Sequence, residues 1–175
     1  MRLLVPDRYL TDVRAIDLDD LQARGIDALL LDLDNTILRR DTNEVPSALE
    51  DWVASLSDCG FKVCLISNNW HEPVRRVAAE LGLELVSKAI KPLPFAFWVA
   101  LRRIGARAHR SAVVGDQLFT DVLGGKLIGA TTIMVLPLSS TDLPHTLLLR
   151  RLEARIMKGA QPEQATGATR GVDRT

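Results

Sequence analysis

The stretch of sequence that decides the fold reads ALLLDLDNT and occupies residues 28–36. It joins a β-like run over 28–33, apolar except for Asp32, to a polar loop, a pattern typical of a buried strand. Asp32 and Asp34 stand two residues apart where the predicted strand ends. Buried carboxylates without partners cost free energy, and a divalent cation would remove that cost. The stretch therefore predicts a strand that ends at a metal site, with an Asx turn or a helix cap as the alternative interpretation.

Outward from this stretch, short apolar runs alternate with amphipathic stretches. Further buried strands are predicted over 61–66, 83–86, 111–114 and 131–136. Helices are predicted between them, and after the last strand, over 46–59, 72–81, 94–104, 120–128 and 144–158. Strands that alternate with helices form right-handed βαβ units around a parallel sheet. The predicted fold class is α/β, a three-layer Rossmann-like parallel sheet with helices on both faces.

Length and composition indicate one globular domain. The chain has 175 residues, 47% of them hydrophobic, which is enough apolar material for one core. We expect that domain over residues 1–158 and a disordered tail over 159–175, a segment poor in bulky apolar side chains. Basic and acidic residues balance at 22 each, which argues against a nucleic-acid-binding protein. The sequence makes no prediction of oligomeric state.

Cysteine content and hydropathy bear on the compartment. Cys59 and Cys64 form no metal-binding or disulfide pattern, so they are interpreted as small apolar residues in a reducing compartment. No apolar run approaches the ~18 residues of a transmembrane segment. No signal peptide is recognisable at the N-terminus either. We expect a cytoplasmic protein, either free or resting on the inner face of a membrane.

Polar residues that directly follow strands form the candidate site, because ligands of an open parallel sheet bind beyond the carboxyl ends of its strands. Ser67, with Asn68 beside it, follows the second predicted strand, and Lys91 comes soon after the third. Asp116 follows the fourth strand, and Asp121 stands five residues later. Taken singly, Ser67 also fits a plain turn residue, Lys91 a solvated surface lysine and Asp121 a helix N-cap. Their order along the chain favours one common site.

That order resembles the haloacid dehalogenase (HAD) phosphatases. Asp32-Leu33-Asp34-Asn35-Thr36 matches the DxDxT first motif of the family, and Ser67, Lys91 and the run 115–121 stand where its later motifs do. The resemblance extends over about residues 28–135. It implies that Asp32 attacks phosphorus and forms an aspartyl-phosphate. It further implies that Asp34 protonates the leaving oxygen and then activates the water that hydrolyses this intermediate.

The resemblance also implies how the phosphate is bound. The hydroxyl groups of Thr36 and Ser67, together with Asn68 and the loop amides, would hold phosphate oxygens. Lys91 would offset the negative charge of the nucleophile and the phosphate.

A magnesium ion is the implied cofactor. Its ligands would be the side chains of Asp32 and Asp116 and the backbone carbonyl oxygen of Asp34, with phosphate and water completing the shell. Asp121 would support the site by holding Lys91 or a metal-bound water. Gln117 departs from the pattern, because many members of the family have an acidic residue at this position. We expect Gln117 to support the site and to leave the metal shell less acidic.

Loop lengths argue against a cap domain. Only 32 residues separate Asp34 from Ser67, and only 23 separate Ser67 from Lys91. Each interval is used by one predicted helix and one predicted strand, so neither can hold a domain with a core of its own. The site should therefore be open, which suits a phosphate carried by a large body such as a lipid, a protein or a nucleic-acid end.

Pro6-Asp7-x-Tyr9 and Ile16-Asp17-x-x-x-Leu21-x-x-x-Gly25-Ile26 precede the first motif. Together with the motifs above, this pattern resembles the YqeG-like branch of capless HAD phosphatases, which is similar to phosphatidylglycerophosphate phosphatases. The resemblance implies hydrolysis of that lipid to phosphatidylglycerol at a membrane surface. The leucines and arginines of 144–158 could form a basic amphipathic helix at such a surface, or the leucines could pack on the sheet. Trp70 could contact lipid, or pack at the rim of the site.

Two alternative functions stay open in the sequence. One is a capless phosphatase for a nucleotide, a sugar phosphate or a phosphoprotein. The other is a phosphate-binding or partner-binding protein without activity, which the presence of both Asp32 and Asp34 argues against.

Overall fold

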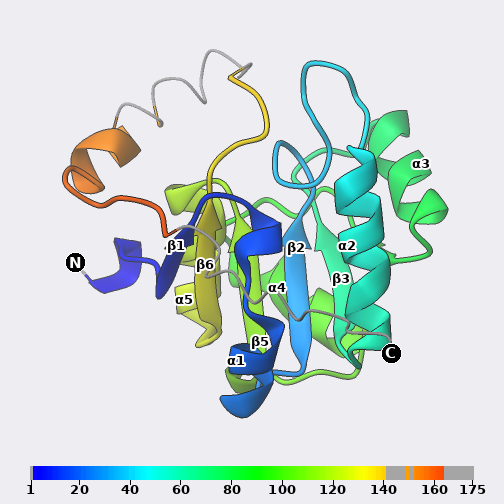
Figure 1. Cartoon of the computed structure of the whole chain (residues 1–175), viewed down its shortest axis with the longest axis horizontal. Helices are drawn as coiled ribbons and strands as arrows, with labels where there is room; N and C mark the ends of the chain where they lie inside the picture. The colour runs from blue at the N-terminus through cyan, green and yellow to red at the C-terminus, as the bar shows by residue number, and fades with distance from the viewer. Residues whose placement is uncertain (1, 141–148, 150–151, 164–175) are drawn as a thin grey trace, which may run out of the picture.

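Six parallel strands form one sheet in the computed structural model, which describes residues 2–140, 149 and 152–163. The order across the sheet is β1-β6-β5-β2-β3-β4, so β2 lies at the centre between β5 and β3. Figure 1 shows the carboxyl ends of the strands toward the top, where the loop after β2 rises. The strands are β1 (Arg8–Leu10), β2 (Ala28–Asp32), β3 (Lys62–Ile66), β4 (Glu84–Val86), β5 (Ser111–Gly115) and β6 (Thr131–Val135).

Helices cover both faces of the sheet, and the predicted three-layer α/β fold class is confirmed. On β2, Leu29 and Leu31 belong to the core beneath α1, α2 and α3, whereas Leu30 belongs to the core beneath α4 and α5. This alternation follows from the two-residue period of a strand. The helices are α1 (Leu18–Ala23), α2 (Ser47–Asp58), α3 (Glu72–Glu80), α4 (Pro94–Arg103) and α5 (Leu123–Ile128).

Short helical segments complete the described chain. A five-residue π-helix, η4 (Leu118–Val122), leads directly into α5. Single turns of 3-10 helix lie at η1 (Arg2–Leu4), η2 (Val13–Ala15) and η3 (Ala108–Arg110). Residues 152–156 are helical, and the remainder of the helix predicted over 144–158 lies outside the described residues, apart from residue 149 and residues 157–158.

Close packing between α4 and α5 positions the start of α4 near the end of the sheet. Phe97 is fully buried, and a Cβ atom on Gly124 would lie 2.4 Å from its ring carbons. Only glycine at position 124 therefore lets the two helices approach this closely. Because the loop before α4 carries Lys91, this contact helps to place that lysine.

The strand β1 and the helix α1, both before β2, are elements that the sequence did not predict. The three residues of β1 are too few to show the alternation that reveals a strand. The preceding Asp7 anchors β1, since its Oδ2 accepts a hydrogen bond from the backbone nitrogen of Thr132 at 2.8 Å and its Oδ1 from Lys126 Nζ at 2.5 Å.

The segment after the last helix also contacts β1. The backbone nitrogen of Glu163 donates to the carbonyl of Tyr9 at 2.7 Å, and its carboxylate pairs with Arg8 at 2.6 Å. The predicted tail over 159–175 thus begins with residues that lie against the sheet, and its part from 164 onward lies outside the described residues. Among the helices that the structure describes, none has the length and hydropathy needed to span a membrane.

Candidate active site

The end of β2 places Asp32 at the centre of the site. Its side chain is 5% exposed, and each of its carboxylate oxygens accepts a hydrogen bond. Oδ1 accepts from Lys91 Nζ at 2.5 Å, and Oδ2 accepts from Thr36 Oγ1 at 3.2 Å. Asp32 therefore lies at the base of the site, with its orientation fixed from two sides.

The turn after Asp32 is held by Asn35. Its φ of 66° lies in the left-handed region, which asparagine tolerates better than most residues. Its Nδ2 donates to the Ser139 carbonyl, and its Oδ1 accepts from the Ser139 nitrogen and hydroxyl, each at 2.9 Å. These buried bonds fasten the loop after β2 to the loop after β6. Neither residue was predicted as part of the site.

Lys91 is buried between two carboxylates. Its Nζ lies 2.5 Å from Asp32 Oδ1 and 2.6 Å from Asp121 Oδ1. Burial alone lowers the pKa of an ammonium group, but the adjacent carboxylates of Asp121 and Asp32 outweigh it and raise the pKa of Lys91. The backbone nitrogen of Lys91 donates to Asn68 Oδ1 at 2.7 Å. Lys91 therefore stays charged at neutral pH, and hydrogen bonds hold both its ammonium group and its backbone.

The turn after β5 depends on Gly115. A Cβ atom there would lie 2.3 Å from Cγ of Asp121, so a larger residue would displace that carboxylate. Asp121 Oδ2 accepts hydrogen bonds from the Gln117 backbone nitrogen at 3.2 Å and from Thr120 Oγ1 at 3.1 Å. Asp121 lies inside the π-helix η4, and the alternative interpretation as a helix N-cap is wrong. Of the two roles implied for Asp121, holding Lys91 or a metal-bound water, its position against Lys91 fits the first.

Three buried carboxylates lie close together in this site. Oxygen atoms of Asp32, Asp116 and Asp121 lie within 4.8 Å of one another. Burial raises the pKa of Asp32, and the charges of Asp121, Asp116 and Asp34 raise it further against the opposing effect of Lys91. Lys91 pairs with two of the three carboxylates, those of Asp32 and Asp121. A divalent cation with oxygen ligands fits this donor set.

Asp34 has different surroundings from Asp32. It is only half-buried, and its carboxylate accepts hydrogen bonds from Ser67 Oγ at 2.5 Å and from Asn69 Nδ2 at 2.8 Å. The backbone nitrogen of Asn69 in turn donates to Ser67 Oγ at 3.0 Å. Asn69 is a site residue that was missed. The available signal was its spacing of two residues from Ser67 after the same strand.

A cavity of about 180 Å³ opens beside Asp34. Its lining combines Asp34 and Asn69 with side chains from the loop after β2 and from the start of α3, among them Arg40 and His71. The lining residues are Asp34, Leu38, Arg40, Asn43, Asn69, His71, Pro73 and Val74.

All of the predicted site residues lie at the carboxyl edge of the sheet, but several contact protein groups there. The hydroxyls of Thr36 and Ser67 donate to Asp32 and Asp34. Asn68 is exposed, and its side chain holds the backbone of Lys91. Gln117 is half-buried, and its backbone nitrogen contacts Asp121. Their binding of phosphate or metal stays a prediction.

Comparison with known proteins agrees with the geometry of the site. A family model described as HAD-hydrolase-like matches residues 89–141. The probable phosphatase YqeG of Bacillus subtilis (strain 168) is 34% identical over 156 residues, which cover 89% of this chain and 91% of that protein. Phosphatidylglycerophosphate phosphatase 1 of Arabidopsis thaliana is 25% identical over 173 residues, and the match spans 90% of this chain but only 48% of the plant protein.

The fold is shared with solved structures at lower identity. One is the cobalt-bound form of the deoxy-D-mannose-octulosonate 8-phosphate phosphatase from Haemophilus influenzae, with a TM-score of 0.53 and 16% identity. The similarity covers 77% of this chain and 88% of that one. At this identity the likeness concerns the fold alone.

Proposed function

Because the chain belongs to the HAD family of hydrolases and is a phosphatase related to YqeG, we propose that it removes the terminal phosphate of phosphatidylglycerophosphate with Asp32 as the nucleophile. The observation that carries the chemistry is the contrast between its two motif aspartates. Asp32 is buried against an ammonium group, whereas Asp34 is half-buried beside an open cavity. One carboxylate is placed for attack and the other for proton transfer.

In the first step, a carboxylate oxygen of Asp32 attacks phosphorus while the bond from phosphorus to the leaving oxygen breaks. Asp34 gives a proton to that oxygen, so the alcohol leaves neutral. In the second step, Asp34 takes a proton from water as the water oxygen attacks phosphorus. The bond to Asp32 breaks, inorganic phosphate is released and the carboxylate is restored.

Other residues would stabilise the charge that moves between these steps. Lys91 would offset negative charge on the transferring phosphoryl group, and Asp121 would hold Lys91 in place. The donors on Thr36, Ser67 and Asn68 would bind phosphate oxygens once substrate enters. Mg²⁺, held by Asp32, Asp116 and the Asp34 carbonyl, would supply positive charge to the acidic cluster.

The lipid substrate is supported by the open site and by the relatives. The intervals after Asp34 and after Ser67 are occupied by α2 with β3 and by α3 with β4, which leaves no segment there for a cap domain. The cavity beside Asp34 contains Arg40, a cation suited to the anionic phosphodiester of this leaving group. The plant relative is named for the same substrate.

The test is a substrate panel with purified protein and Mg²⁺. Monomeric short-chain phosphatidylglycerophosphate is compared with nucleotides, sugar phosphates and a phosphopeptide at matched concentrations. We expect the highest kcat/KM for the lipid phosphate. Higher kcat/KM for a soluble ester, with the lipid left intact, would overturn the substrate but not the phosphatase chemistry.

A further inference from the structure

Five large apolar side chains are exposed on the segments that flank Lys91 and Asn69. Phe95 is 77% exposed, although phenylalanine side chains are usually buried in folded proteins. The other four are between 49% and 67% exposed. We call this group the apolar patch, and it consists of Trp70, Ile90, Leu93, Phe95 and Trp98.

The helix α4 presents two of these side chains on its outer face. Phe95 and Trp98 are three residues apart and therefore share one side of the helix. The opposite side carries Phe97 and Leu101, which are buried in the core beneath the sheet. The outward position of Phe95 and Trp98 is thus fixed by the packing of their neighbours. Turning the helix to bury them would expose the core.

Trp70 and Ile90 are tied to the active site through short segments of backbone. Trp70 follows Asn69, which holds Asp34, and Ile90 precedes Lys91. The backbone nitrogen of Lys88 donates to the carbonyl of Asn69 at 3.3 Å, and its Nζ lies 4.8 Å from the centre of the Trp70 ring. The loops that position the catalytic groups therefore also carry the apolar patch.

Ile90 adopts a conformation that burial does not explain. Its φ of 52° is left-handed, a region that β-branched residues rarely occupy. Its side chain is nevertheless 67% exposed. Its backbone carbonyl accepts a hydrogen bond from the Leu93 nitrogen at 3.0 Å, so the turn before α4 holds this conformation. The turn leaves the apolar side chain in water, where a ligand surface outside the chain could cover it.

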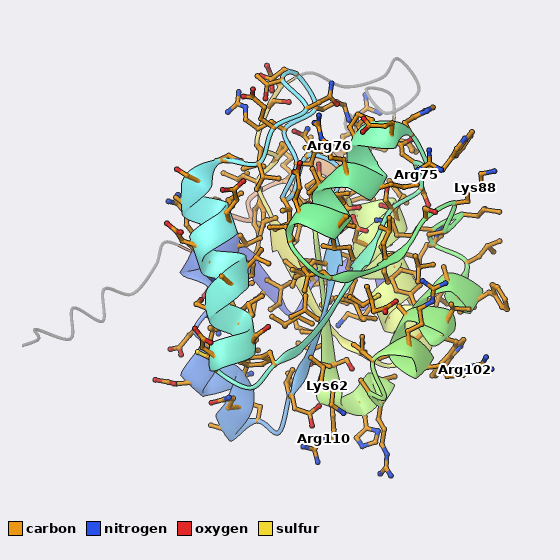
Figure 2. The ribbon with its side chains drawn as sticks, turned by 90° about the vertical axis from the view of Figure 1, so that its right-hand side faces the viewer. Lys62, Arg75, Arg76, Lys88, Arg102 and Arg110 are labelled. Carbon is orange, nitrogen blue, oxygen red and sulfur yellow. The ribbon has the colours of Figure 1, made fainter. Side chains whose placement is uncertain are left out.

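Basic side chains accompany the apolar patch. Arg75 on α3, Lys88 and Arg102 on α4 all point outward on the side of the molecule that Figure 2 shows. Within the described part of the chain, none of the three forms an ion pair. Glu72 is an acidic residue at the start of α3, and Glu84 is already paired with Arg103. The chain has zero net charge, so this excess of cations is local.

We propose that the apolar patch docks the protein on the surface of an anionic lipid bilayer. Aromatic rings with a polar neighbour and basic side chains around them suit the boundary between headgroups and acyl chains. Docking in this orientation would present the open site to phosphate groups at the membrane surface. The relevance of this docking to catalysis rests on the lipid substrate proposed above, whereas the binding itself does not.

The charges also decide between a membrane and a second copy of the chain. In a twofold dimer the same patch would face itself, and the three cations of each copy would approach those of the other. An anionic surface instead compensates them. We therefore assign the patch to lipid, and self-association becomes an outcome that the experiment can reveal.

The experiment measures binding of the full chain to vesicles of phosphatidylglycerol and of phosphatidylcholine by sedimentation and by tryptophan emission. The wild-type protein should bind phosphatidylglycerol vesicles, and its emission should shift to shorter wavelength. The double variant Phe95→Ser/Trp98→Ser should bind at least about tenfold more weakly, because two exposed aromatic side chains lose their burial in lipid. The matched control Val5→Ser/Leu127→Ser removes two exposed apolar side chains elsewhere and should bind like wild type.

Three substrates separate the possible failures. An activated soluble ester reports intact chemistry, monomeric short-chain phosphatidylglycerophosphate reports the proposed function, and the long-chain lipid in vesicles reports docking. The Phe95/Trp98 variant should lose activity only on vesicles. Failure of the wild type on both lipids, with the soluble ester cleaved, would overturn the proposed function.

The docking proposal has its own contrary results. It is overturned if the wild type does not bind anionic vesicles, or if the Phe95/Trp98 variant binds them and turns over the long-chain lipid as well as wild type does. A wild-type dimer that the same double variant converts to a monomer, without vesicle binding, would assign the patch to a second copy.

Discussion

Two regions of this molecule lie next to each other and differ in almost every physical property. The inner cluster of Asp32, Lys91, Asp116 and Asp121 consists of buried ionisable side chains at the carboxyl edge of the sheet. The outer rim, formed by the apolar patch, is exposed and belongs to loops and one helix face. Burial strengthens the electrostatic interactions that phosphoryl transfer requires, whereas exposure is needed to meet a large substrate. The difference suggests that reaction type and substrate access are encoded in separate residues.

The largest effect should come from replacing the nucleophile. Asp32→Asn should reduce phosphatase activity by on the order of 10⁴-fold or more, because no aspartyl-phosphate can form. The same change removes one of the two carboxylates that pair with Lys91, so the melting temperature of the metal-free variant checks that it still folds. Kinetics and a thermal melt measure the two effects. Retained activity in a folded variant would contradict the assigned role.

The next effect tests the geometry of the inner cluster without touching a charged residue. Gly115→Ala places a Cβ against the Asp121 carboxylate and should shift Asp121 with Lys91. We expect a fall in kcat of about 10²-fold, the usual consequence of a displacement near 1 Å. Gly129→Ala is the control, since its positive φ of 75° strains the helix end far from the site. It should cost about 1 kcal/mol of stability and leave kcat unchanged.

Magnesium should stabilise the inner cluster by binding its carboxylates. At a concentration 100 times its Kd, Mg²⁺ should add about 2.7 kcal/mol to the free energy of unfolding. Asp116→Asn should abolish most of that gain, because a neutral amide is a poorer ligand for Mg²⁺ than a carboxylate. Denaturant titrations with Mg²⁺ and with EDTA measure both quantities. An equal response of wild type and variant to Mg²⁺ would show that Asp116 does not bind it.

A smaller effect lies at the boundary between the two regions. Asn69→Ala removes one of the two hydrogen bonds that orient Asp34, and should lower kcat about tenfold. Asn43→Gly is the matched control, because Asn43 lines the same cavity, has a positive φ that glycine accepts, and makes no bond to Asp34. Equal kcat values for both variants would mean that Asn69 does not position the acid–base group.

The two regions were not equally predictable. Asp32, Lys91 and Asp116 could be located because their types and order are those of a known motif and each follows a strand. Asn35 with Ser139 could not, since residues 104 positions apart carry no local signal of their pairing. The apolar patch was hidden for another reason. Phe95 and Trp98 fit the helical period of a core face as well as that of a lipid-binding face, and only the burial of Phe97 resolves which side is inward.

The most direct test of the account is to locate the phosphoryl group during turnover. The enzyme is mixed with substrate and Mg²⁺, quenched within one turnover and reduced with borohydride, which converts a phosphorylated aspartate to homoserine. Peptide mass spectrometry should then find homoserine at position 32 and unmodified aspartate at position 34. Homoserine at position 34, or a pre-steady-state burst with no modified aspartate, would contradict the assignment of Asp32 as the nucleophile.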